Sequence, residues 1–210
     1  MTDIFREIEE DLRRDNLKKL WSRYGRYLII VAVVAVLAAG GVVAWRSHEL
    51  SQMRAQSQDY AAAFALASSG KNAKAAKVFG AIAEEGGGYA LLARFEEAAL
   101  LAKAGKPKAA LALYDRLARS PGLDPSFRNL ATLHAAMLER DPQRRIDLLK
   151  PLTAKDSPWR PSALELTALA RLEKGDRAGA LAIYKDLAKD PAAPPRLKAR
   201  AAQMVEALAS

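Results

Sequence analysis

Few side chains in this sequence could carry out chemistry, and their spacing argues against a reaction centre. The two histidines, His48 and His134, have no partner ligands at the spacing of a zinc motif. Glu84-Glu85 and Glu96-Glu97 are adjacent pairs, and neighbouring residues of a helix point to different faces, so neither pair makes an acid–base dyad. Gly70-Lys71 lacks the upstream glycines of a phosphate-binding loop. We therefore expect no enzymatic activity.

Composition excludes several further classes. The absence of cysteine excludes disulfides, thiol nucleophiles and cysteine-ligated zinc. The hydrolase, metalloprotease, dinucleotide and P-loop motifs are absent as well, so we expect no cofactor, no metal and no small-molecule substrate. The net charge is +9, but the basic residues are scattered singly without interleaved aromatic residues, which predicts a solvated helical surface and no nucleic-acid binding.

A repeat organises most of the chain. Residues 103–119, KAGKPKAALALYDRLAR, closely match residues 173–189, EKGDRAGALAIYKDLAK, and residues 69–84 fit the same pattern 35 residues upstream. Residues 139–154 are an eroded fourth copy. Since Ala, Leu, Arg, Lys and Glu are strong helix formers, a period near 35 predicts stacked helix pairs.

Three positions define each unit. A glycine ends the first helix, an alanine five residues later admits the second helix closely, and an aromatic residue fills the space between units. These residues are Gly70, Ala75 and Phe79; Gly105, Ala110 and Tyr114; and Gly175, Ala180 and Tyr184. The third unit lacks its glycine, and Pro151 should shorten its second helix. The last seventeen residues, PPRLKARAAQMVEALAS, read as an amphipathic helix that seals the final unit.

An apolar surface is expected on the first helices, which line the concave side of such a stack. The side chains that should form this protein-binding groove are Tyr60, Phe64, Leu92, Phe95, Phe127, Leu130, His134, Met137 and Leu169. The alternative is that the same residues form the core between the helices. The two readings remain open for each residue.

One apolar segment stands apart from the repeats. Residues 27–45, YLIIVAVVAVLAAGGVVAW, carry no charge and as a helix would extend about 28 Å, close to the thickness of a bilayer core. Tyr27 and Trp45 flank it, as aromatic residues do at membrane interfaces. The run is longer than the apolar part of a cleavable signal peptide, which is the alternative. We expect a transmembrane signal anchor.

The flanks of this segment predict its orientation. Six basic residues precede it closely, whereas Arg46 and Arg54 alone follow at a similar distance. By the positive-inside rule, residues 1–26 stay in the cytoplasm and residues 46–210 are exported. The amphipathic residues 1–26 are interpreted as a helix lying on the membrane surface, with a docking helix for a cytoplasmic partner as the alternative.

Two resemblances extend this interpretation. The glycine, alanine and aromatic residues of the repeats resemble the tetratricopeptide consensus over about residues 56–192. The whole layout, with DLRRDNLKKLWSRYGRYLI before the span and SPWRPSALELTALARLEKGD in the last unit, resembles the ancillary Sec translocon subunit family. That resemblance implies a single-pass protein of the bacterial inner membrane whose periplasmic domain associates with the SecYEG channel, periplasmic chaperones and exported polypeptides.

The expected architecture is all-α. It comprises one N-terminal transmembrane helix, a right-handed α-solenoid of about four tetratricopeptide-like helix pairs and a C-terminal capping helix. The expected function is non-catalytic binding of exported polypeptides or chaperones near the Sec translocon. The alternative is a structural scaffold for an envelope assembly or cell-division complex.

Overall fold

The computed structural model describes the backbone of residues 2–209 and, within it, the side chains other than those of residues 2–20, 22, 28 and 32. All regular secondary structure in residues 2–209 is helical, which confirms the expected all-α class. The helices are α1 (Thr2–Ser68), α2 (Asn72–Glu85), α3 (Ala90–Lys103), α4 (Pro107–Ala118), α5 (Pro125–Leu138), α6 (Pro142–Leu149), the 3₁₀ helix η1 (Lys150–Thr153), α7 (Arg160–Glu173), α8 (Arg177–Lys189) and α9 (Pro195–Ala209).

The chain divides into two units, residues 1–55 and residues 56–210. In the first unit, α1 carries an apolar stretch with a mean hydropathy of 2.7 and no burial, which makes it long and apolar enough to cross a membrane. Its apolar side chains are open to the surroundings, as Val36 and Leu37 show at 70% and 69% exposure. The apolar face expected in residues 1–20 lies outside the described side chains.

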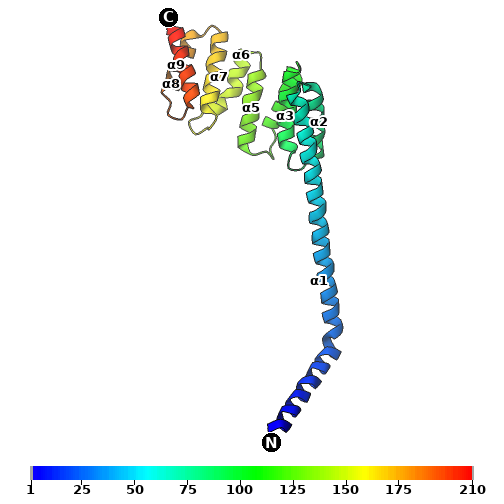
Figure 1. Ribbon diagram of the computed structural model, residues 1–210. Helices are drawn as coiled ribbons and strands as arrows, with labels where there is room; N and C mark the ends of the chain where they lie inside the picture. The colour runs from blue at the N-terminus through cyan, green and yellow to red at the C-terminus, as the bar shows by residue number, and fades with distance from the viewer. Residues whose placement is uncertain (1, 210) are drawn as a thin grey trace. The chain divides into compact units, whose positions relative to one another are not determined.

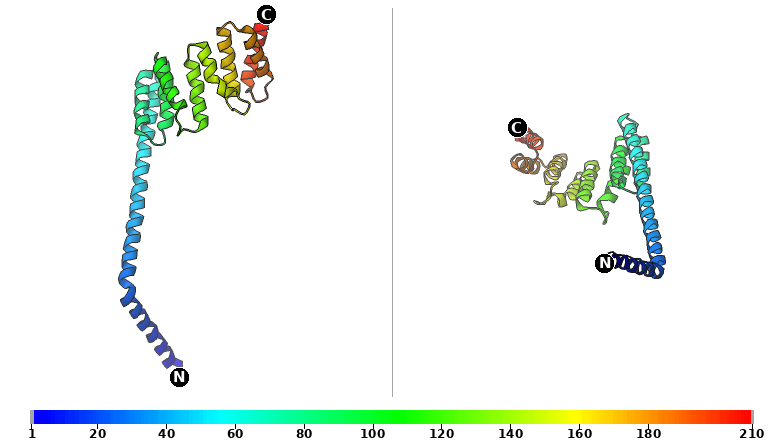
Figure 2. Two further views of the ribbon diagram at one scale, coloured as in Figure 1. Left: turned by 180° about the vertical axis from the view of Figure 1, so that it is seen from behind. Right: turned by 60° about the horizontal axis from the view of Figure 1, so that its bottom comes forward.

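The second unit is a row of helix pairs, each packed on its neighbours in chain order (Figure 1). The end of α1 is the first helix of the first pair, because Ala63 is fully buried against α2. The following pairs are α3 with α4, α5 with α6 and α7 with α8, and α9 closes the row (Figure 2). Four separate apolar clusters, instead of one shared core, lie along it.

Glycines in the left-handed region end three of the first helices. Gly70, Gly105 and Gly175 have φ values of +75°, +77° and +82°. At each of them the amide donates to a carbonyl three residues earlier, and the next amide donates to a carbonyl five residues earlier, as Lys106 does to Leu101 at 2.9 Å. This arrangement satisfies the last carbonyls of the helix and costs little only without a side chain.

Small residues and single rings build the cores between helices. Ala75, Ala110 and Ala180 are fully buried, so the two helices of each pair approach closely at these points. Phe79, Tyr114 and Tyr184 are 0%, 3% and 2% exposed and pack against both helices of their own pair and the helix that follows. In the third pair Leu149 takes the place of the ring, also fully buried.

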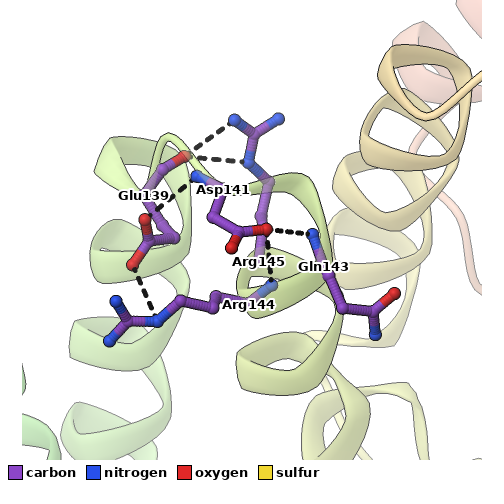
Figure 3. A network of polar contacts seen from close by, with 5 residues as sticks. All are labelled: Glu139, Asp141, Gln143, Arg144 and Arg145. Carbon is purple, nitrogen blue, oxygen red and sulfur yellow. Dashed lines mark hydrogen bonds and ion pairs between the residues drawn. The ribbon is translucent and has the colours of Figure 1, made fainter.

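The third pair has no glycine at the end of its first helix, and side chains satisfy the backbone groups of the turn instead. The α5–α6 turn uses an extended residue, Glu139, at the helix end. Asp141 then caps α6 by accepting hydrogen bonds from the amides of Gln143 and Arg144 at 2.8 and 3.3 Å. Arg145 covers the Glu139 carbonyl through Nε and Nη2 at 3.2 and 2.7 Å (Figure 3). The second helix stops at Leu149 and continues as η1, as expected for a proline at position 151.

The last helix seals the row. Leu197 and Ala201 are buried against α8, and Met204 and Leu208 pack on the same cluster. Arg177 at the start of α8 reaches the end of α9, where its Nε donates to the Leu208 carbonyl at 3.1 Å. A helix with one buried face and one polar face is what the end of a repeat stack requires.

Candidate protein-binding surface

The 35-residue repeat places the expected binding residues at corresponding positions of successive first helices. Each set of corresponding residues is called a column. Tyr60, Phe95 and Leu130 are separated by 35 residues each, and so occupy the same position in successive first helices. Leu92 and Phe127 share a second position. A third position, one turn further along each helix, holds Phe64, His134 and Leu169. Since residues three, four and seven apart lie on one side of an α-helix, the columns form one face of the first helices.

Five of the nine expected side chains lie on the surface of this face. Their exposed fractions are 57% for Phe64, 48% for Leu92, 39% for Phe127, 57% for Met137 and 40% for Leu169. Within the described part of residues 56–210, these five are all of the exposed large apolar side chains. We refer to them together as the first-helix face. Exposed apolar side chains at corresponding positions of successive repeats favour a protein-interaction site.

The other four residues are half-buried and contribute to the cores. The ring of Tyr60 meets the rings of Phe79 and Tyr89 at centroid distances of 5.0 and 5.2 Å. Phe95 and His134 pack around Tyr114, and Leu130 is partly covered. The sequence pattern therefore combined two sets of residues, one that faces outward and one that supports it from beneath.

Phe95 is the centre of an aromatic cluster under the middle of the face. Its ring lies 6.1 Å from Tyr114, 6.4 Å from Phe127 and 6.4 Å from His134. Burial, reinforced by the nearby Glu96 carboxylate, raises the pKa of Tyr114 to about 12. Burial also lowers the pKa of His134. Both groups are therefore uncharged at neutral pH, and the Glu96 carboxylate is a charged group beside them.

Sequence reasoning missed a charged pair at the far end of the same columns. Glu165 lies 35 residues after Leu130, and Arg200 lies 35 residues after Glu165. The Arg200 Nε and Nη2 atoms donate to the two carboxylate oxygens of Glu165, each at 2.9 Å. The 35-residue ruler was a sufficient signal to find both residues.

The described side chains contain no cluster suited to metal binding. Among them, no group of three His, Asp or Glu residues is placed to hold a metal ion. An open hollow of about 420 Å³ lies beside the Arg160–Asp190 ion pair, whose guanidinium and carboxylate atoms lie 2.7 Å apart. The candidate functional site is therefore the exposed first-helix face.

The tetratricopeptide repeat-like domain family matches residues 18–204, which is most of the chain. The chain belongs to this family. Its repeats accordingly make it a protein–protein interaction module, and such folds are typically non-catalytic scaffolds. Comparison with curated proteins gives no match.

Solved structures support the same fold. The chain is similar to a crystal structure of nearly identical TPR-like repeats from a putative kinesin light chain of Podosopora anserina, with 15% identity and a TM-score of 0.54. A single-substitution variant of those repeats gives a TM-score of 0.55 at the same identity. Both matches cover 72% of this chain and 90% of the other. At this identity the likeness concerns the fold alone.

Proposed function

We propose that this protein is a non-catalytic protein-binding subunit anchored in the bacterial inner membrane and ancillary to the Sec translocon. Residues 27–45 are the anchor, residues 1–26 are cytoplasmic and residues 46–210 form a periplasmic domain. The observation that carries the proposal is the first-helix face, an apolar surface on a repeat domain whose chain also holds a span-length apolar helix.

The anchor assignment is supported by exposure and charge. The described apolar side chains of α1 between residues 29 and 45 are exposed, and Gly40 and Gly41 have no neighbour where a side chain would stand. Exposure of so much apolar surface is costly in water and favourable in lipid. The excess of Lys and Arg before residue 27 supports a cytoplasmic N-terminus.

The task proposed for the repeat domain is to bind exported polypeptides or periplasmic chaperones and pass clients on. A chain leaving the export channel is not yet folded and presents apolar side chains that a folded protein hides. Burying them against the first-helix face would contribute roughly 25 cal/mol per Å². Met137, which is unbranched and exposed, can adapt to side chains of different shapes.

Site-specific photo-crosslinking in living cells tests this proposal. A photoreactive residue at position 64 or 127 should form adducts with translocon subunits, chaperones or exported proteins. The same residue at Lys185, an exposed position on the second helix α8, is the matched control. If positions 64 and 127 gave no adducts beyond those of position 185, the proposal would be wrong.

A scaffold for an envelope assembly or division complex is the second candidate, and one feature favours it. Lys71, Lys74 and Lys103 surround an open hollow of about 440 Å³ at the start of α2. These ammonium groups suit an acidic patch on a folded partner. Partner binding of this kind should weaken strongly with salt and survive Phe127→Ser, whereas client binding should do the reverse.

A further inference from the structure

The face changes chemistry at its C-terminal end. The column that holds Tyr60, Phe95 and Leu130 continues with Glu165 in α7 and Arg200 in α9. Glu165 and Arg200 also lie close to Tyr184, because the charges of both affect its pKa. Tyr184 is the counterpart of Tyr114 in the fourth pair. An apolar surface thus runs along three helix pairs and ends at an ion pair.

Apolar positions dominate the face in the first three pairs, and Glu96, whose charge acts on Tyr60 and Tyr114, borders them. The positions that line the face in α1, α3 and α5 are Ser57, Tyr60, Phe64, Ala67, Leu92, Phe95, Ala99, Ala102, Phe127, Leu130, His134 and Met137. Desolvating an unpaired charge against such a surface would cost several kcal/mol, roughly. A partner that covers these apolar side chains should therefore present apolar side chains to them.

Consecutive first helices are bridged by the second helix between them, as α4 packs on both α3 and α5. A peptide that crosses three first helices must therefore be extended over several residues, at about 3.3 Å per residue. The next residues of the same segment then lie over Glu165 and Arg200.

The ion pair itself is unevenly exposed. The Arg200 side chain is 57% exposed and the Glu165 side chain 21%. A guanidinium has five N–H groups in a planar fork, and the contacts with Glu165 occupy two of them. No other acceptor for Arg200 is found in the part of the chain that the structure describes. The remaining donors suit a second carboxylate, which Arg binds with short, charge-assisted hydrogen bonds.

We infer that the first-helix face selects an apolar polypeptide segment that is followed by a carboxylate, which Arg200 binds while Glu165 holds it in place. The inference rests on the proposed function, since it names the class of segment that the same face takes. It makes Arg200 a specificity-determining residue at one end of the face.

Peptide binding to the full chain in lipid nanodiscs tests this inference. The probes are fluorescent peptides with an identical run of six apolar residues, followed by two Asp, two Asn or two Lys residues. Anisotropy is measured at constant ionic strength, and binding to empty nanodiscs is subtracted. We expect the Asp peptide to bind about two- to fivefold more tightly than the Asn peptide, the range of a partly exposed ion pair. The Lys peptide should bind most weakly.

Two substitutions should move this preference in opposite directions. Arg200→Gln should abolish the advantage of the Asp peptide while leaving the Asn peptide unchanged. Glu165→Gln removes the competing carboxylate, so the advantage should increase. Arg196→Gln is the matched control, because it removes one positive charge from an exposed position of the same helix. Thermal unfolding of each variant verifies that the fold is retained.

The outcomes separate this inference from the proposed function. Equal affinity for the three peptides, or an equal loss in Arg196→Gln and Arg200→Gln, overturns the inference and leaves apolar binding intact. If no peptide binds, or if Phe64→Ser and Phe127→Ser leave all affinities unchanged, the binding role of the face fails and the inference fails with it.

Discussion

The imidazole of His134 stacks on the ring of Tyr114, with centroids 5.0 Å apart and planes inclined by 13°. The contact joins α4 to α5 and places an ionisable group beneath an apolar surface. The Phe95 ring meets the imidazole at a steep angle of 64° and helps to cover it. The helix packing thus favours the neutral form of the histidine, which is why its pKa is lowered by burial.

This burial predicts a loss of stability in mild acid. As the pH falls through about 6.5, the unfolded chain takes up a proton at His134 before the folded chain does, because burial lowers the pKa of His134 in the folded chain, so the free energy of unfolding decreases. The contribution is complete above that pH and can change by no more than about 1.4 kcal/mol per pH unit. Urea unfolding of wild type and His134→Phe at pH 7.5 and 5.5 measures it. The wild type should lose more stability than the variant; a parallel loss would contradict the prediction.

Two phenylalanines of the first pair should respond very differently to truncation. Phe79 is fully buried among Tyr60, Ala63 and α3, so Phe79→Ala should lower the free energy of unfolding by about 3–5 kcal/mol. Phe64→Ala should change it by less than about 0.5 kcal/mol, because this ring is largely exposed. Chemical denaturation followed by circular dichroism gives both values. Similar losses for the two variants would show that Phe64 belongs to the core.

The cap glycines should not tolerate a side chain without cost. Gly105 has φ +77° and open space around its Cα, so Gly105→Ala adds no clash, but forces alanine into the left-handed region at a cost of about 1 kcal/mol. Gly122 also has open space and lacks a positive φ, so Gly122→Ala should be neutral or slightly stabilising. Melting temperatures of the two variants test the difference, and the order Gly122→Ala below Gly105→Ala would refute the explanation.

Substitutions of two neighbouring arginines in the third pair should also differ in their effect on stability. The Arg145 side chain is 14% exposed and binds the Glu139 carbonyl twice and the Glu173 carboxylate at 2.7 Å. Arg145→Ala should therefore cost about 1–3 kcal/mol. Arg144 is 74% exposed and 3.7 Å from Glu139, and its removal should cost less than about 1 kcal/mol. Hydrogen exchange of the α6 amides should rise in the Arg145 variant, and unchanged exchange would argue against this role.

The 35-residue repeat predicted the features of the fold that depend on single residues. Glycine caps, buried alanines and one ring per unit are requirements of individual positions, so Gly105, Ala110 and Tyr114 were readable from sequence. The same holds for Pro151, because a proline limits a helix wherever it stands. The family match and the solved structures confirm a tetratricopeptide-like solenoid.

The division of the candidate surface could not be predicted in the same way. Phe64 and Tyr60 are both large apolar residues of one helix, and only the angle of the neighbouring pair decides which is covered. The hydrogen bonds at the α5–α6 turn could not be predicted either. The Arg145 side chain donates to the Glu139 carbonyl, and no short sequence motif encodes this contact. The anchor, its orientation and the Sec association stay predictions.

The four separate apolar clusters have a mechanical consequence. Because each is shared only between adjacent helix pairs, a force applied to the last helix would not meet the resistance of the entire domain at once. The row would instead yield one pair at a time from the pulled end, lengthening in steps and recoiling when released. Such a domain would act as a compliant tether between its N-terminal end and a partner bound to the repeats.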